Sequence, residues 1–267
     1  MPELPDVESF RRVLAKSGLD KTIAQVVVGD KRILGKLALG TFVDRLKGAK
    51  LASARRHGKH LLAGIDRGGF LTLHFGMTGA LHFIPRPDEE PPFTRVRLDF
   101  AGDGSLAYSN KRMLGRVGLT EDAAAFIAEQ KLGPDALDPR FDLAAFKAAL
   151  LGAKRDVKTM LMDQEIIAGI GNIYSDEILF QARLDPATAA NSLSASEQKR
   201  LFATMREVLK TAVARGAGSE QFTERMPKGS LLPERHRHGH CPRCGSPLKV
   251  LRVGGRTAYC CPKCQKC

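Results

Sequence analysis

The order of hydrophobic and polar residues begins with the pattern of an amphipathic helix. Residues 5–17 place Val7, Phe10 and Leu14 at helical spacing on one face. Asp6 falls in the first turn, where a negative charge suits the positive end of the helix dipole. We therefore expect a helix at the start of the chain.

The pattern from about residue 22 to residue 120 is that of short β-strands. Residues 94–100 (TRVRLDF) alternate strictly between apolar and polar side chains, which predicts a strand with one buried face. Residues 70–84 predict a further strand pair, broken at residues 76–79. Short strands at regular spacing favour a sandwich or a barrel.

Residues 131–141 are rich in Pro, Gly and Asp and mark a boundary. Three helices are then predicted, at residues 142–152, 173–182 and 194–216. Ser194 and Glu197 have the spacing of a capping box, which marks where the last of these helices begins. Residues 217–240 are polar and weakly patterned, so we expect a loop.

The charge of the chain adds a candidate partner. Lys and Arg number 42 and Asp and Glu 29, for a net charge of +13. From Arg225 to Cys267 there are ten basic residues and one acidic residue. This balance fits either a plain basic protein or one that binds a polyanion, most often nucleic acid. No apolar run reaches the roughly 18 residues of a membrane span, and the acidic N-terminus is no signal peptide, so we expect a cytoplasmic protein.

All six cysteines lie between Cys241 and Cys267. Cys241 and Cys244 form one C-x-x-C pair, and Cys261 and Cys264 form a second. Two such pairs at this spacing predict one structural Zn²⁺ in a tetrahedron of four thiolates, with no open position for chemistry. Cys260 and Cys267 could replace neighbouring ligands or remain free thiols.

The residues between the two cysteine pairs predict a β-hairpin. Its turn falls at Gly254 and Gly255, which places Arg256 at the tip. The hairpin would therefore present a cation next to the metal module.

The run from residue 164 to residue 186 holds a glycine turn before a predicted helix. Free N–H groups at a helix start attract phosphate, and Asn172 could cap the helix or donate to a phosphate oxygen. Lys154, Arg155 and Lys158 just upstream strengthen the phosphate interpretation. A simple glycine turn with an Asn cap remains the alternative.

Four motifs together resemble the formamidopyrimidine-DNA glycosylase/endonuclease VIII family of base-excision repair enzymes. They are PELPDVE at residues 2–8, RRHGKHLL at 55–62, DQEIIAGIGNIYSDEILF at 163–180, and the terminal cysteine pairs with their hairpin arginine. They span the chain in order, and the first and third are the most specific.

The resemblance implies a role for the first residues. Removal of Met1 would free the secondary amine of Pro2, which the family uses to attack C1′ of a damaged nucleoside. An α-amine titrates near pH ~8, so much of it is nucleophilic at neutral pH. With Met1 attached, the Pro2 nitrogen is an amide and cannot attack. Glu3 matches the general acid–base, and Asp6 stands where the family usually has Glu. A rigid N-terminal arm is the alternative interpretation of this motif.

The resemblance also implies contacts to DNA. Lys59, Asn172 and Arg256 match residues that grip phosphates around the lesion, and Lys154 and His74 are further DNA contacts. Met77, Arg112 and Leu114 would fill the gap left by an extruded base, with Met113 and Leu114 replacing the family's Arg and Phe. Taken alone, Lys59 would fit a solvated surface lysine and Met77 a core residue.

The predicted fold is α+β with two domains. A catalytic β-sandwich with its N-terminal helix would span residues 1–130, followed by a linker at 131–141. A helix-two-turn-helix domain at 142–232 and a zinc finger at 233–267 complete the chain.

The predicted function is a monomeric, bifunctional glycosylase and abasic-site lyase. It would bind damaged duplex DNA between its domains and nick by β,δ-elimination. The lesion stays open between oxidised purines, ring-opened purines and oxidised pyrimidines. A non-catalytic damage-binding protein on the same fold and a zinc-ribbon adaptor are the alternatives.

Overall fold

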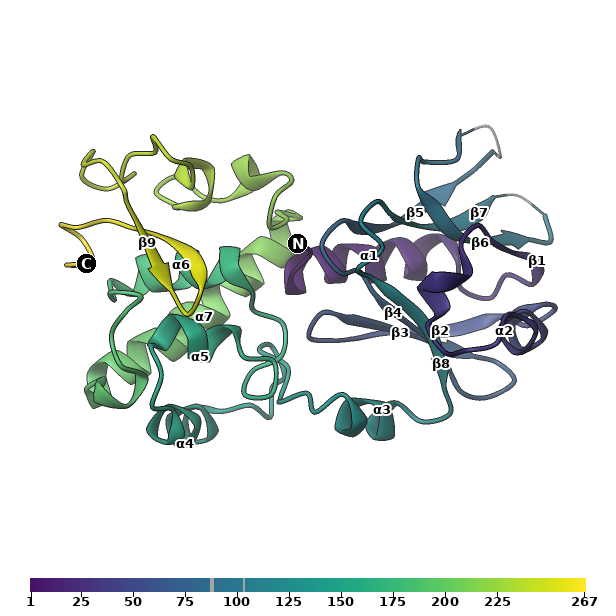
Figure 1. Cartoon of the computed structure of the whole chain (residues 1–267), viewed down its shortest axis with the longest axis horizontal. Coiled ribbons are helices and arrows are strands. Elements are labelled where there is room, and N and C mark those ends of the chain that lie inside the picture. The colour runs from purple at the N-terminus through teal and green to yellow at the C-terminus, as the bar shows by residue number, and fades with distance from the viewer. Residues whose placement is uncertain (87–88, 103) are drawn as a thin grey trace. The chain divides into compact units, whose positions relative to one another are not determined.

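The structure, a computed structural model, describes residues 1–86, 89–102 and 104–267 (Figure 1). The chain forms two compact units. The first comprises Met1–Pro2 and Val7–Gln130, and the second comprises Glu3–Asp6 and Lys131–Cys267. Within these described ranges, no helix has both the length and the apolar character needed to cross a membrane.

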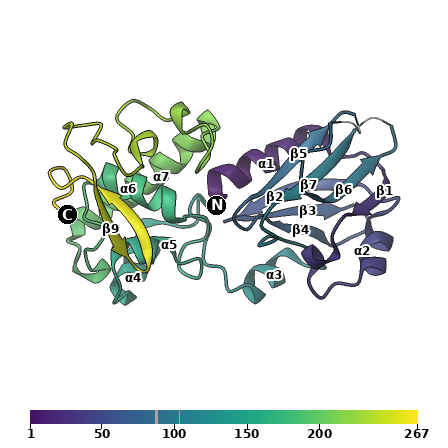
Figure 2. The same ribbon diagram turned by 45° about the horizontal axis from the view of Figure 1, so that its top comes forward.

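The first unit contains two four-stranded antiparallel sheets, in the orders β1-β6-β7-β5 and β2-β3-β4-β8 (Figure 2). The strands are β1 (Ile23–Val28), β2 (Leu51–His57), β3 (His60–Ile65), β4 (Phe70–His74), β5 (Gly79–Ile84), β6 (Thr94–Phe100), β7 (Ser105–Asn110) and β8 (Arg116–Thr120). Buried side chains of both sheets form one hydrophobic core, which Val7 and Leu14 of helix α1 (Leu4–Ser17) join. The predicted sandwich with its N-terminal helix is therefore confirmed.

Two predictions for the first unit need correction. The region between residues 22 and 120 is not all strand, because it holds the 3₁₀ turn η1 (Lys31–Leu34) and helix α2 (Leu39–Leu46). Phe42 and Leu46 of α2 are fully buried, so packing on the core stabilises a helix too short to predict from its sequence. The strands predicted as a pair at residues 70–84 are β4 and β5, which belong to different sheets.

The second unit is helical and ends in a β-hairpin. The short helix α3 (Ala123–Glu129) ends the first unit. The elements of the second unit follow in the order α4 (Leu143–Gly152), α5 (Val157–Met162), α6 (Asn172–Ala182), η3 (Ala190–Ser192), α7 (Ala195–Arg215), η4 (Thr223–Arg225), η5 (Leu232–Glu234), β9 (Lys249–Val253) and β10 (Arg256–Cys260). The capping box of Ser194 and Glu197 is present at the start of α7. Val253 pairs with Arg256 across a two-residue turn, as predicted.

Residues 217–240 are more ordered than the loop that the sequence predicts. They contain the short turns η4 and η5, and Met226, Leu231 and Leu232 are buried. Leu231 packs with Phe180 of α6 and with cysteines of the C-terminal module. This segment therefore joins the helices to the cysteine module.

Candidate active site

The turn before α6 is fixed by the side chain of Gln164. Its Nε2 donates to the carbonyl oxygens of Met162 at 2.7 Å and Ile170 at 2.8 Å, and its Oε1 accepts from the N–H of Gly169 at 3.0 Å. Gly169 has φ of +119°, and a Cβ at this position would lie 2.7 Å from a methyl group of Leu4. The turn therefore closes tightly on the N-terminal segment.

Glu3 lies in this turn and is almost fully buried, with 1% of its surface exposed. Its carboxylate accepts hydrogen bonds from three backbone N–H groups, those of Gly171 at 2.7 Å, Ile173 at 2.8 Å and Tyr174 at 3.2 Å. A Cβ on Gly171 would lie 2.5 Å from the carboxyl carbon, so only glycine leaves room for Glu3. The carboxylate directly follows Pro2 and is held in one position.

These contacts correct two predictions about the start of α6: that Asn172 caps the helix, and that its free backbone N–H groups attract phosphate. The N-cap of α6 is Gly171, and no side chain of the helix's own segment caps it. The N–H groups of Gly171, Ile173 and Tyr174, which we expected to attract phosphate, bind the Glu3 carboxylate instead. The anion predicted at this helix start is thus supplied by the chain itself.

Asp6 supports the same segment one turn later. Its carboxylate accepts from the N–H of Glu3 at 2.8 Å and from the N–H of Ser219 at 3.1 Å. Burial raises the pKa of Asp6, while the hydrogen bonds from the two backbone groups oppose that rise. Asp6 therefore ties the N-terminal segment to the residues that follow α7.

A buried network of charged side chains, not predicted from the sequence, contacts the backbone of Asn172. Asp176 accepts from Lys158 Nζ at 2.6 Å and from Arg235 Nε at 2.8 Å. Lys158 also donates to the carbonyl oxygen of Asn172 at 3.0 Å. One signal was available: apolar residues of α6 fall on every side of the helix, so a carboxylate among them is expected to be buried and paired.

This network corrects the prediction that Lys158 strengthens a phosphate site. Lys158 is fully buried beside Asp176 and cannot reach an external anion. Arg155 forms an ion pair with Asp163 at 2.5 Å. Lys154, the third basic residue singled out upstream of α6, is exposed.

The hairpin that carries Arg256 is anchored to the helices. The N–H of Tyr259 in β10 donates to Asp176 at 3.3 Å. A Cβ on Gly254 would lie 2.0 Å from the hydroxyl of Thr159 in α5, so the turn rests directly on that helix. Arg256 itself is exposed. The Asp176 carboxylate thus binds both the hairpin of Arg256 and Lys158, and Lys158 in turn binds the backbone carbonyl of Asn172.

Lys59 forms the turn between β2 and β3, where His57 pairs with His60. Only 8% of Lys59 is exposed, so it is not a solvated surface lysine. The His60 and His74 rings lie 4.8 Å apart on adjacent strands. Burial lowers the pKa of His60 to about 3 and also lowers that of His74, and the nearby Lys59 charge adds to both effects. Lys59 therefore lies near two imidazoles whose pKa values are both lowered.

The predicted wedge residues lie on two loops that touch. Arg112 donates to the Met77 sulfur at 3.6 Å, and its backbone N–H donates to the Thr78 hydroxyl at 3.0 Å. Met77 is half-buried and stands outside the core of the first unit. Leu114 is 53% exposed. The structure brings Met77 and Arg112 together and leaves Leu114 projecting.

The four predicted metal ligands form one cluster. The Sγ atoms of Cys241, Cys244, Cys261 and Cys264 all lie within 4.8 Å of one another. The Cys241–Cys264 and Cys244–Cys261 sulfur distances are 3.8 and 3.5 Å. Zinc–sulfur bonds of about 2.3 Å in a tetrahedron place sulfurs about 3.8 Å apart. The cluster can therefore hold a metal of this size and preference.

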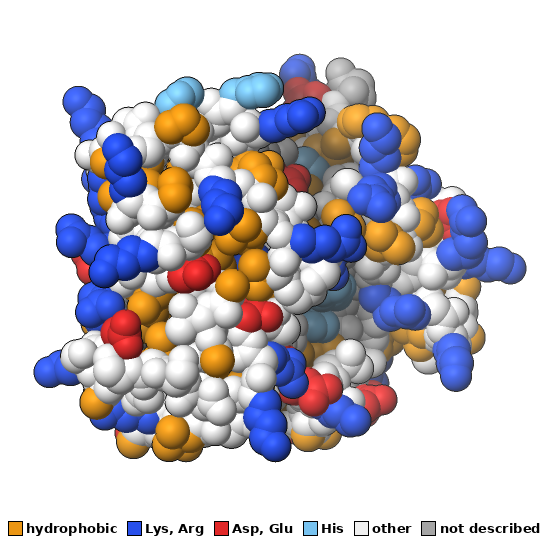
Figure 3. Space-filling view, turned by 60° about the vertical axis from the view of Figure 1, so that its left-hand side comes forward, with side chains coloured by type: hydrophobic (Ala, Val, Ile, Leu, Met, Phe, Trp, Pro, Cys, Tyr) orange, Lys and Arg blue, Asp and Glu red, His pale blue; other side chains and the backbone are white. Residues whose placement is uncertain are grey.

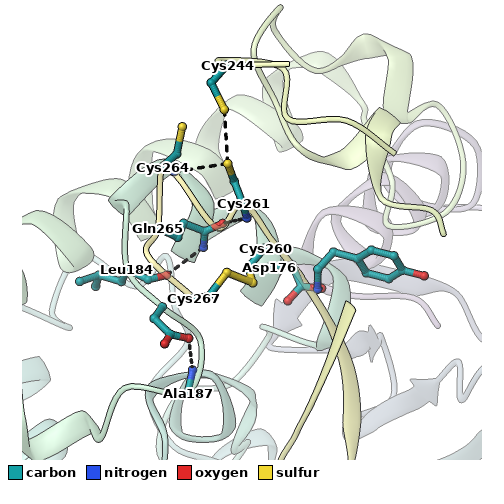
Figure 4. The surroundings of a disulfide bond; sticks show 11 residues. Asp176, Leu184, Ala187, Cys244, Cys260, Cys261, Cys264, Gln265 and Cys267 are labelled. Atoms are coloured by element: carbon teal, nitrogen blue, oxygen red, sulfur yellow. Dashed lines mark hydrogen bonds between the residues drawn. A yellow bond between two sulfur atoms is a disulfide. The ribbon is translucent and has the colours of Figure 1, made fainter. Parts of the chain in front are cut away.

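Cys260 and Cys267 are neither spare ligands nor free thiols, because they form a disulfide. Figure 4 shows this bond near Cys244, Cys261 and Cys264, with Gln265 lying between Cys261 and Leu184. Gln265 accepts from the N–H of Cys261 at 2.9 Å and donates to the carbonyl oxygen of Leu184 at 2.8 Å. The disulfide and the hydrogen bonds of Gln265 thus fix the residues that flank the ligands Cys261 and Cys264.

Comparison with known proteins gives a consistent result for both units. Residues 1–117 match the formamidopyrimidine-DNA glycosylase N-terminal domain, and residues 132–224 match the formamidopyrimidine-DNA glycosylase H2TH domain. The chain is 35% identical over 273 residues to the formamidopyrimidine-DNA glycosylase of Carboxydothermus hydrogenoformans, covering 100% of both chains. It is 37% identical over 278 residues to that of Streptococcus pyogenes serotype M28, covering 100% of this chain and 99% of the relative.

Solved structures agree with this comparison. A Lactococcus lactis formamidopyrimidine-DNA glycosylase bound non-covalently to DNA with an AP site superposes with a TM-score of 0.89 at 28% identity, over 99% of this chain and 100% of that one. The Lactococcus lactis Fpg in complex with DNA that contains N7-benzyl-Fapy-dG gives a TM-score of 0.90 at 28% identity over 100% of both chains.

Proposed function

The chain belongs to the formamidopyrimidine-DNA glycosylase family, and from this premise we propose that it is a bifunctional DNA glycosylase and abasic-site lyase. One observation carries the proposal. The carboxylate that follows Pro2 is buried and held by three backbone N–H groups of the second unit. An acid–base group has to be fixed within hydrogen-bond reach of the reacting atoms, and Glu3 is fixed in this way directly after Pro2.

The proposed reaction begins when Met1 is removed and the Pro2 nitrogen becomes a secondary amine. This nitrogen attacks C1′, the N-glycosidic bond breaks, and the base leaves with a proton. Glu3 moves the protons of the sugar and the base. Opening of the sugar gives an iminium at C1′, from which β-elimination breaks the bond to the 3′ phosphate and δ-elimination the bond to the 5′ phosphate. Asp6 holds the backbone N–H of Glu3 and so positions the acid–base group.

The proposed substrate is duplex DNA with ring-opened purines or abasic sites, the kinds of DNA named for the structural relatives. Lys59, Asn172, Arg256 and Lys154 would contact phosphates, and His74 would lie near them. Lys and Arg are spread widely over the face shown in Figure 3, where Asp and Glu are fewer. The contact between Arg112 and Met77 supports a wedge of Met77, Arg112 and Leu114 at the site of the extruded base.

We further propose one structural Zn²⁺ on Cys241, Cys244, Cys261 and Cys264. Four thiolates leave no coordination position for substrate, so the metal would hold the two cysteine turns and the hairpin of Arg256 in place. A non-catalytic damage-binding protein would share this module. Such a protein would still need Glu3 to hold the start of α6, but it would have no use for the secondary amine of Pro2 next to Glu3. The pairing of Pro2 with Glu3 therefore favours the enzyme.

The test is covalent trapping. Protein freed of Met1 is mixed with a duplex that carries one abasic site, and borohydride is added to reduce any iminium. We expect a stable protein–DNA adduct that disappears when Met1 is retained and falls sharply in Pro2→Gly, whose amine is primary. No adduct together with tight binding to the same duplex would overturn the enzyme proposal and favour the damage-binding alternative.

A further inference from the structure

An aromatic ring is displayed at the surface of the first unit just before β6. Phe93 is 47% exposed. The Lys111 ammonium lies 5.7 Å and the Arg95 guanidinium 5.9 Å from the ring centroid. Both distances are within the range of cation–π attraction. The ring is therefore flanked by two cations.

The backbone that presents this ring is irregular at two points. Phe93 has φ of +64°, a left-handed conformation that bulky residues rarely adopt. In the pairing of β6 with β7, Thr94 is opposite Ser109 and Val96 is opposite Tyr108, so Arg95 is an extra residue in a β-bulge. Bulges redirect side chains and are common next to active sites. Here the bulge directs Arg95 toward the same place as Phe93.

Both irregular residues are fastened to Asn110, the last residue of β7. Arg95 Nε donates to the Asn110 carbonyl oxygen at 3.0 Å, and the Asn110 N–H donates to the Phe93 carbonyl oxygen at 2.9 Å. Asn110 is fully buried and donates through its side chain to the carbonyl oxygen of Phe75 at 3.1 Å. The loop that carries Lys111, Arg112 and Leu114 begins at the next residue. The exposed ring is thus fixed to the base of the proposed wedge loop.

We propose that Phe93, Arg95 and Lys111 form a stacking platform for an unpaired nucleobase of the bound DNA. The ring would stack on the base, because every nucleobase has an aromatic face. The two cations would hold the phosphates on either side of it. This inference rests on the proposed function, since it requires that the chain binds DNA in which a base has lost its partner.

The experiment compares two duplexes of one sequence. The first is fully paired, and the second has a non-cleavable tetrahydrofuran abasic-site analogue opposite 2-aminopurine. Affinity is measured by fluorescence anisotropy at several salt concentrations, and stacking by quenching of the 2-aminopurine. We expect Phe93→Ala to weaken binding of the second duplex about tenfold, to reduce the quenching, and to leave the paired duplex and the salt dependence unchanged.

Matched variants separate stacking from other effects. Phe93→Gly also removes the ring but adopts a positive φ without strain. It should therefore show the loss of binding and quenching that removal of the ring alone causes, without any contribution from backbone strain. Phe93→Trp should retain binding. Lys111→Ala should lower the salt slope by about one. Leu39→Ala, at a residue of the same unit that is 45% exposed, should change nothing.

Two results would overturn the platform. One is a ring-less variant that binds both duplexes as the wild type does, and the other is an equal loss on both, which would indicate a general contact or a site for a protein partner. If the wild-type chain binds neither duplex, the proposed function fails, and the platform fails with it. That outcome is recognised from the wild type alone, before any variant is compared.

Discussion

At the scale of single residues, Glu3 is both the proposed acid–base group and the group that caps α6. Its carboxylate supplies the N-terminal cap of α6 from the other end of the chain, and it does so with both oxygens. A carboxylate cap at a helix start contributes about 0.5–2 kcal/mol to stability. The residue proposed to move protons is therefore also one on which the second unit depends.

Replacing Glu3 should for this reason affect two measurements together. We expect Glu3→Ala to lower the free energy of unfolding by about 1–2 kcal/mol and to reduce base removal by about 10²-fold or more. Glu3→Gln should recover only part of the stability, because the NH₂ group of Gln is a donor and would replace one of the two oxygens that accept hydrogen bonds from the backbone N–H groups. Urea unfolding and single-turnover kinetics test this, with Glu129→Ala at an exposed position of α3 as control. An unchanged unfolding midpoint in Glu3→Ala would contradict the capping role.

At the scale of elements, α6 organises the second unit. Lys158 donates a hydrogen bond to the carbonyl oxygen of Asn172, the first residue of the helix. The carboxylate of Asp176, in the middle of the helix, accepts hydrogen bonds from Lys158, from Arg235 and from the backbone of the hairpin. The next residue, Glu177, accepts from Gln181 at 2.7 Å and from the N–H of Leu232 at 2.8 Å. The helix therefore fixes the segment after α7 as well as the hairpin.

Glu177 should make the stability of this helix depend on pH. Burial raises its pKa from 4.5 to about 7. Because the folded state binds this proton more tightly than the unfolded state, the stabilisation is complete below about pH 4.5 and is lost as the pH rises through 7. We expect Glu177→Gln to remove this part of the pH dependence, so that its stability exceeds that of the wild type most at pH 8. Urea unfolding from pH 5 to pH 8 measures it, and parallel curves for the two proteins would contradict the expectation.

The hairpin module allows a separate prediction about its cysteines. Cys244→Ser should lower the zinc content well below one ion per chain, whereas Cys260→Ala combined with Cys267→Ser should keep one ion. The double variant loses the disulfide and should lose about 2 kcal/mol of unfolding free energy. Elemental analysis after dialysis and urea unfolding distinguish the two effects. Loss of zinc from the double variant would mean that the ligand set is wrong.

At the scale of the whole molecule, the sequence predicts what is local and misses what is distant. The helix at residues 5–17, the capping box of α7 and the hairpin turn at Gly254 and Gly255 each depend on neighbouring residues, and all are present. Helix α2 depends on packing against the strands of the first unit, and Lys158 pairs with Asp176 of another helix, beyond the reach of a local pattern. The contact of Glu3 with Gly171 spans 168 residues. No local pattern could predict that the helix start would already hold an anion.

The double use of Glu3 also bears on how such a chain can evolve. A protein can drift from enzyme to binding protein when its catalytic residue is free to change without structural loss. Here that first step would leave three buried backbone N–H groups without their acceptor. A descendant that kept the fold but abandoned the reaction would need a new cap for α6 before it could lose Glu3. The fold thus resists the loss of its proposed acid–base residue.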